Sequence, residues 1–253
     1  MKIRFLGTGT STGNPEIGCR CEVCTSSDSR DWRFRASVLA EIKGKRILID
    51  CGPDFRMQML KTLETDDFSV LEGVLLTHEH YDHVGGLDDL RAFCRNGALP
   101  VYAEEYVADA IRSRLSYVFK EHKYPGIPNL ALTPIKNQPF FVSGIKIIPI
   151  RLMHGNLPIL GYRIDNFAYL TDLKTIPEEE FEKLQDLDVL VINALRIKEH
   201  IAHQNLQQAL HNIDRIKPRR AYLTHVSHRF GLHSFMERNL PENVFIACDG
   251  LVI

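Results

Sequence analysis

The hydrophobic positions of the chain fall into short runs rich in valine, isoleucine and leucine, separated by turn residues and charge. Apolar runs of four to eight residues with such boundaries are typical of buried β-strands. The pattern predicts strands at residues 3–6, 37–42, 47–50, 74–77, 101–103, 145–152, 160–164, 168–171, 189–193, 221–224 and 244–247.

Between several of these runs the apolar residues recur at helical spacing, and some of the segments open with a capping residue or a proline. Both features mark the start of an α-helix. The pattern predicts helices at residues 55–63, 106–117, 177–184, 206–216 and 234–239.

The order of these elements predicts an α/β (α+β) fold. The tight turn Lys43-Gly44-Lys45 joins two strands early in the chain and favours antiparallel pairing there. A sheet packed on a second sheet, with helices outside, accommodates both this turn and the later strand–helix alternation. No repeat or linker divides the sequence, so we expect one domain over residues 1–253. Residues 119–137, which contain three prolines, are expected to form an irregular loop.

Composition narrows the functional classes. Of 253 residues, 44% are apolar and 25% charged, and the net charge of −1 disfavours a large nucleic-acid partner. No run approaches the roughly 18 apolar residues of a membrane span, so no membrane partner is expected. The first residues carry no signal-peptide pattern, and we expect a cytoplasmic protein.

Cysteines are distributed unevenly. Cys19, Cys21 and Cys24 are clustered, whereas Cys51, Cys94 and Cys248 stand apart. In a reducing compartment a cluster of this kind indicates metal binding rather than a disulfide framework.

The motif His78-x-His80-x-Asp82-His83 directly follows an apolar run. Imidazole and carboxylate are ligands that zinc and manganese accept. His78 and His80 alternate along a chain leaving a strand, so both can face one metal ion, while Asp82 and His83 at the next helix start can reach a second.

Three apolar runs end in Leu-Thr followed by a residue that can bind metal, namely His78, Asp172 and His225, and a fourth run delivers His154. Strand ends in one sheet layer meet at the same edge. Although each residue alone would more often be structural, as a set they are interpreted as ligands.

These residues resemble the metallo-β-lactamase superfamily of dinuclear hydrolases. The resemblance spans the chain and implies a four-layer αββα sandwich with two divalent ions, zinc or manganese, at one edge. It implies that Asp172 bridges the two ions. The other ligands would be His78, His80 and His154 on one ion, and Asp82, His83 and His225 on the other.

Within the superfamily, the chain resembles most closely the PhnP-like cyclic phosphodiesterases. The resemblance rests on Gly7-Thr8-Gly9-Thr10-Ser11, the Cys19-x-Cys21-x-x-Cys24 cluster and the run Gly86 to Arg91 after the metal motif. It implies a structural zinc on Cys19, Cys21, Cys24 and His228.

The same resemblance implies a function. A metal-bridging hydroxide would hydrolyse a small cyclic phosphodiester, such as a phosphoribosyl 1,2-cyclic phosphate or a 2′,3′-cyclic nucleotide. Asp172 would hold the ion pair, and His203 would protonate the leaving oxygen as a group titrating near neutrality. His200 is a poorer candidate for that role. Family members often form homodimers.

Three alternatives remain. A tRNA 3′-processing endonuclease would use the same ligands, but its long arm for tRNA has no room in the 18 positions between His154 and Asp172 (172 − 154). Hydrolysis of a β-lactam or a thioester fits the carboxylates Asp82 and Asp172 less well. A metal-binding scaffold without catalysis would be expected to have lost ligands, and here none is lost.

Overall fold

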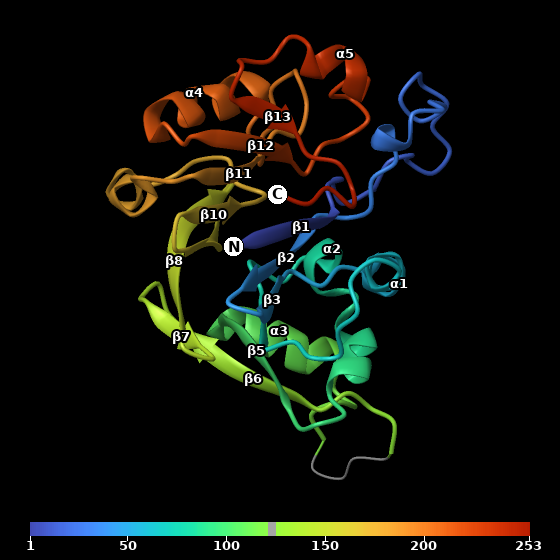
Figure 1. The fold of residues 1–253 in the computed structure, drawn as a ribbon, viewed down its shortest axis with the longest axis vertical. Helices are drawn as coiled ribbons and strands as arrows, with labels where there is room; N and C mark the ends of the chain where they lie inside the picture. Colours follow the sequence, from blue (N-terminus) through green and yellow to red (C-terminus); the bar gives the residue numbers. More distant parts are fainter. Residues whose placement is uncertain (121–124) are drawn as a thin grey trace.

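The computed structural model describes residues 1–120 and 125–253, and over these residues the strands form two sheets (Figure 1). The first sheet has the strand order β1-β2-β3-β4-β5-β6. Its strands are β1 (Lys2–Gly7), β2 (Ser37–Ile42), β3 (Lys45–Ile49), β4 (Gly73–Leu75), β5 (Leu99–Glu104) and β6 (Leu130–Ile135).

The second sheet has the order β13-β12-β11-β10-β9-β8-β7. Its strands are β7 (Phe140–Val142), β8 (Ile145–His154), β9 (Leu157–Ile164), β10 (Phe167–Leu170), β11 (Val189–Asn193), β12 (Arg220–Thr224) and β13 (Val244–Ile246).

Each sheet is antiparallel in one half and parallel in the other. Strands β1, β2 and β3 pair antiparallel, as the turn at residues 43–45 predicts, whereas β3 to β6 pair parallel. In the second sheet β7 to β10 are antiparallel and β10 to β13 parallel. Parallel neighbours need crossover connections, which is why helices enter the fold beside these strands.

Helices cover the outer face of each sheet. Apolar side chains of α1 (Phe55–Leu63), α2 (Tyr81–Val84) and α3 (Glu105–Arg114) form one core cluster with the first sheet. α4 (Leu206–Ile216) and the 3₁₀ helix Glu178–Leu184 form another with the second sheet. A third cluster lies between the sheets and draws residues from both. The predicted αββα sandwich is therefore confirmed.

The two ends of the chain meet at the centre of the molecule (Figure 1). Ile3 N–H donates to the Ile253 carbonyl at 2.8 Å, and the Ile253 N–H donates back to Ile3 at 2.9 Å. Since β1 belongs to the first sheet and β13 to the second, these bonds tie the halves together beside the central core.

Some sequence-based boundaries were wrong. The loop expected at 119–137 contains strand β6, although residues 121–124 of that loop lie outside the described part. Pro134 obscured this strand, and proline is tolerated because β6 is the edge of its sheet. β7, a short edge strand, was also missed.

Three predicted helices need adjustment. The helix expected at 106–117 is α3, which begins at Glu105 and ends at Arg114. The one expected at 234–239 is the short α5 (His233–Glu237), and the segment at 177–184 is the 3₁₀ helix Glu178–Leu184. The predicted bounds of α1 and α4 are confirmed. No helix in the described residues has both the length and the apolar character needed to cross a membrane.

Tyr162 links the two sheets by a buried hydrogen bond. Its hydroxyl on β9 donates to the carbonyl of Leu76, just beyond β4, at 2.6 Å, and the side chain has no exposed surface. Leu76 leads directly into the His-rich segment, so this bond fixes the position from which that segment leaves the first sheet.

Tyr162→Phe is expected to lower the free energy of unfolding by about 1–3 kcal/mol, because it leaves a buried carbonyl without its donor. Urea denaturation measures this difference. Tyr106→Phe is the matched control: the Tyr106 hydroxyl also donates to a carbonyl, that of Pro158, but at a solvent-exposed position where water replaces the bond. Equal losses for both variants would contradict the structural role of the buried bond.

Candidate metal centre

The residues predicted as ligands of the two ions meet at one edge of the sandwich. His78 follows β4, Asp172 follows β10, His225 follows β12, and His154 ends β8. His80 precedes α2, which carries Asp82 and His83. The first sheet thus supplies the His-rich segment, and the second supplies the remaining three ligands.

Three aspartate and histidine residues at strand ends adopt left-handed backbone conformations. The φ angles are +62° at Asp50, +60° at Asp172 and +54° at His225. Such angles are uncommon outside glycine and cost on the order of 1–3 kcal/mol each, so they persist where the surrounding structure enforces them. All three residues lie at the edge where the predicted ligands gather.

The first group of donor atoms comprises Asp82, His83, Asp172 and His225, whose ligand atoms all lie within 4.8 Å of one another. Asp172 Oδ1 is 2.9 Å from His225 Nε2, and Asp172 Oδ2 is 3.4 Å from His83 Nε2. Asp82 Oδ2 lies 3.1 Å from His83 Nε2. All four residues are buried, so their charges interact with little screening by water.

The second group comprises His78, His80 and Asp172, again within 4.8 Å. Asp172 Oδ2 is 3.6 Å from His78 Nε2. The His154 ring lies beside His80, with 5.2 Å between ring centroids. The third group comprises His154, Asp172 and His203, also within 4.8 Å, so His154 is grouped with His203 rather than with His78 and His80. Asp172 is common to all three groups, which is the position that a bridging carboxylate requires.

Two buried nitrogens show how well these residues fit a cation. His78 Nε2 and His83 Nε2 have no hydrogen-bond partner among residues 1–120 and 125–253. Leaving a buried polar atom unpaired costs about 1–3 kcal/mol. Both atoms face Asp172, so a divalent ion there would satisfy the nitrogens and the carboxylate together.

The protonation states of the histidines also fit the binding of a cation. Burial lowers the pKa of His78 well below its usual value, and the neighbouring His83 adds to the effect, so His78 is neutral and able to bind metal. Burial opposes ionisation of His225 too, but Asp172 and Asp82 raise its pKa to about 9. The carboxylates therefore attract positive charge to this group, and metal ions can supply it in place of protons.

Asp50, which the sequence analysis missed, lies behind the ligands. It follows β3, is fully buried, and its Oδ2 accepts from His83 Nδ1 at 2.7 Å. The backbone N–H of Thr77 also donates to it, at 2.9 Å. This contact fixes the His83 tautomer, leaving Nε2 to face the metal position. An acidic residue directly after the apolar run Ile47-Leu48-Ile49 is the signal that could have identified it.

His154 is oriented in a similar way. Its Nδ1–H donates to the Ala202 carbonyl at 3.0 Å, which leaves Nε2 available as a ligand. Ala202 belongs to the loop that carries His203, so the position of a predicted ligand depends on the loop of the predicted acid.

His203 lies within the cluster but does not titrate as expected. Its ring is 4.4 Å from that of His154 and 5.2 Å from that of His225. Burial lowers the pKa of His203 to about 3, although Asp172 opposes the shift. In the protein without ions or substrate the pKa of His203 therefore lies below the neutral range expected of an acid, and its role as the acid stays a prediction.

The loop holding His203 is fixed at its end. Gln204 N–H donates to the Leu173 carbonyl, next to Asp172, at 2.9 Å. Asn205 and Gln208 then form a capping box that starts α4. His200 has a structural contact, since its Nδ1 accepts from the backbone N–H groups of Ala202 and His203 at 3.2 and 3.3 Å.

The predicted zinc ligands also come together. Nδ1 of His228 is 3.2, 3.4 and 3.5 Å from the sulfurs of Cys19, Cys21 and Cys24. A tetrahedral zinc with three thiolates and one imidazole places nitrogen about 3.5 Å from each sulfur. Burial opposes it, but hydrogen bonds from the Cys24 backbone, Cys19 and His228 lower the pKa of Cys21 to about 6, whereas burial raises the pKa of Cys24 to about 11, so in the metal-free group Cys21 is the thiolate. The donor set therefore fits this ion.

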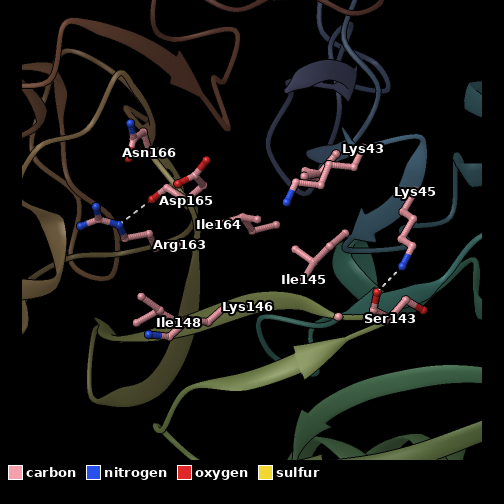
Figure 2. Close-up of a pocket in the computed structure, with 12 residues that line it drawn as sticks. Lys43, Lys45, Ser143, Ile145, Lys146, Ile148, Arg163, Ile164, Asp165 and Asn166 are labelled. Carbon is pink, nitrogen blue, oxygen red and sulfur yellow. Dashed lines mark hydrogen bonds between the residues drawn. The ribbon is translucent and has the colours of Figure 1, made fainter.

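A cavity of about 560 Å³ lies at other strand ends, away from the metal ligands (Figure 2). It is lined by residues of the β2–β3, β7–β8 and β9–β10 turns, including Lys43, Ser143 and Asp165. β8 begins in this lining at Ile145 and ends at the predicted ligand His154, so the strand's full length separates the cavity from the centre.

A family model described as "Beta-lactamase superfamily domain" matches residues 45–226. That range includes every predicted ligand of the two-ion group and His203. It excludes Cys19, Cys21, Cys24 and His228.

Two relatives and one solved structure show similarity over much of the chain. An octanoyltransferase of Porphyromonas gingivalis is 50% identical over 99% of this chain, but the chain spans only 51% of that protein. A coenzyme PQQ synthesis protein B of Xanthomonas axonopodis is 31% identical over 75% of this chain and 71% of that protein. The crystal structure of a diphosphatase from the PhnP family has a TM-score of 0.92 and 36% identity, covering 100% of this chain and 96% of that one.

Asp50→Asn is expected to weaken binding at the His83 metal position by about 10–100-fold, because the amide holds the His83 tautomer less firmly. Competition with a chromogenic chelator on metal-depleted protein measures the affinity. Asp165→Asn is the matched control, since Asp165 also lies after a strand with positive φ but is exposed in a distant turn. A wild-type affinity for Asp50→Asn would contradict this role.

Proposed function

Since the chain belongs to the beta-lactamase superfamily and is a metal-dependent hydrolase, we propose that it hydrolyses phosphoric diesters, in particular small cyclic ribose phosphates. Phosphoribosyl 1,2-cyclic phosphate and 2′,3′-cyclic nucleotides are the proposed substrates. The observation that carries the proposal is the buried Asp172 carboxylate, shared by three groups of histidine and aspartate donors.

Each residue has a definite task in this reaction. Two divalent cations, when bound, supply Lewis-acid contacts to phosphoryl oxygens and a water activated at neutral pH. Asp172 would hold the pair together, with His78, His80 and His154 on one side and Asp82, His83 and His225 on the other. Because this donor set is rich in carboxylate and imidazole, it suits zinc or manganese.

His203 is proposed to assist departure of the leaving oxygen. Its ring packs beside His154 and His225, and its Nδ1 is buried without a partner among the residues that the structure describes. A phosphoryl anion bound beside the ring raises its pKa, since an adjacent negative charge favours the imidazolium. The proton would therefore be acquired with the substrate and passed to the leaving oxygen.

The connection between His154 and Asp172 favours a small substrate over tRNA. β9 and β10 occupy this interval as successive antiparallel strands, which leaves no arm. The net charge of −1 adds no general attraction for a polyanion. A tRNA 3′-processing endonuclease is therefore the less favoured proposal.

A second candidate is hydrolysis of a diphosphate. It is favoured by the similarity to the PhnP-family diphosphatase over the whole chain. The two reactions share attack on phosphorus and differ in whether the leaving oxygen belongs to a sugar or to a second phosphate. Transfer of an octanoyl group is not carried over, because the relative so named is about twice as long as this chain.

The cytoplasmic location, the homodimer and the small-molecule partner remain predictions. So does the count of metals, which is two ions at the Asp172 centre and one zinc at the cysteine group.

Metal-depleted protein reconstituted with Zn²⁺ or Mn²⁺ is expected to cleave the cyclic ribose phosphates with a higher kcat/KM than a nucleotide diphosphate, an octanoyl thioester or a pre-tRNA. Elemental analysis of the same samples gives the metal content. Faster cleavage of the diphosphate would select the second candidate. Full metal loading without turnover on any substrate would favour the non-catalytic scaffold.

His203→Ala is expected to lower kcat for a cyclic ribose phosphate by about 10²-fold or more, because the alkoxide leaving group needs a proton. For bis(p-nitrophenyl) phosphate, whose leaving group departs without one, the loss should be much smaller. His211→Ala, an exposed histidine on α4, is the control. An equal loss for both substrates would contradict the acid role.

A further inference from the structure

Glu16 contacts the cysteine group through its side chain and its backbone. Its Oε2 lies 3.0 Å from His228 Nε2. Its backbone N–H donates to the Cys24 sulfur at 3.4 Å, and its carbonyl accepts from the Cys19 N–H at 3.0 Å. One residue therefore contacts three of the four predicted zinc ligands.

The side-chain contact decides which nitrogen of His228 binds metal. The three sulfurs lie around Nδ1, whereas Glu16 lies at Nε2 across the ring. A carboxylate only accepts, so Nε2 must carry the proton and Nδ1 is left with its lone pair. Because the carboxylate is on the far side of the ring, Glu16 orients a ligand and is not itself one.

His228 stands three residues after His225, and the segment joining them is held on two sides. Val226 N–H donates to the Thr8 carbonyl at 3.0 Å, and Thr10 N–H donates to the Val226 carbonyl at 3.2 Å. Ser227 donates to the Leu195 carbonyl through both its N–H, at 3.0 Å, and its hydroxyl, at 2.8 Å.

These bonds connect the cysteine group to the two-ion centre. The Thr8–Thr10 end continues into the loop that carries Glu16 and the cysteines, and this loop projects from the sandwich (Figure 1). A metal bound by Cys19, Cys21, Cys24 and His228 cross-links that loop to the segment bearing His225. The left-handed backbone at His225 is the conformation that such a cross-link would help to maintain.

We propose that Glu16 is a positioning residue that sets the zinc affinity of the cysteine group, and that the loaded group in turn raises the metal affinity of the Asp82–His83–His225 position. The second half rests on the proposed function, because it assumes ions at the Asp172 centre. Coupling between two binding sites is reciprocal, so metal at the centre also strengthens zinc binding by the cysteines.

Glu16→Ala is expected to weaken zinc binding at the cysteine group by about 10–100-fold, and Glu16→Gln by less, because its amide oxygen still accepts from Nε2. Chelator competition measures the affinity without any turnover. With Co²⁺ as the probe, the thiolate-to-cobalt absorption reports the same site spectroscopically. Glu22→Gln, an exposed glutamate within the same loop, is the control.

The far-ultraviolet circular dichroism spectrum shows whether Glu16→Ala is folded. Unchanged zinc affinity in the folded variant would overturn the first half of the proposal. For the second half, Mn²⁺ affinity at the centre is compared with the cysteine group empty and zinc-loaded. A decrease of about 5-fold or more on emptying supports the coupling, and equal affinities overturn it. Since neither readout uses a substrate, failure of the phosphodiesterase assay is distinguishable from failure of this proposal.

Discussion

The edge of the sandwich where the predicted metal ligands meet depends on one constraint. Three carboxylates are buried there, where the two sheets come together. Asp50, Asp82 and Asp172 lie among six buried or half-buried histidines where little water screens them. Burying carboxylates without partners is among the most costly arrangements in a protein, and the imidazoles compensate only when they carry positive charge. Protonated histidines provide that compensation in the metal-free chain, and divalent ions provide it in the metal-dependent hydrolase.

Because the charged residues come from both sheets, the centre forms only when the two sheets are held in a fixed relative position. The first sheet brings Asp50, His80 and His83, and the second brings His154, Asp172 and His225, so neither sheet forms a centre alone. The central cluster of apolar residues and the paired chain ends hold the sheets at a fixed separation. The strain of three left-handed residues is tolerated because packing on both sides determines where each strand can end.

The sequence predicted those features of the fold and of the site that depend on residues close together in the chain. Apolar runs ending in Leu-Thr predicted strand ends, and His-x-His-x-Asp-His predicted donors on one edge, because both patterns are local. Asp50 and Glu16 were missed, since their roles exist only through His83 and His228, which are distant in the chain. β6 was missed because its proline reads as a loop until its edge position is known. The lowered pKa of His203 was not anticipated, because the sequence does not reveal that folding places this ring beside those of His154 and His225.

The cysteine group and the Asp172 centre differ in their donor atoms, and this difference favours an order in which the two sites bind their ions. The cysteine group has four donors that match a tetrahedral ion and no carboxylate among them, so it can close around zinc and add stability to its loop. The Asp172 centre combines carboxylates with imidazoles, a set that leaves coordination positions open for substrate. Because the segment from His225 to His228 belongs to both, the proposed coupling has a physical source: closing the cysteine group first would remove conformational freedom that the centre would otherwise lose when it binds its own ions. In the proposed coupling, a metal without access to substrate would thus contribute to hydrolysis by reducing the conformational entropy lost when the Asp172 centre binds its ions.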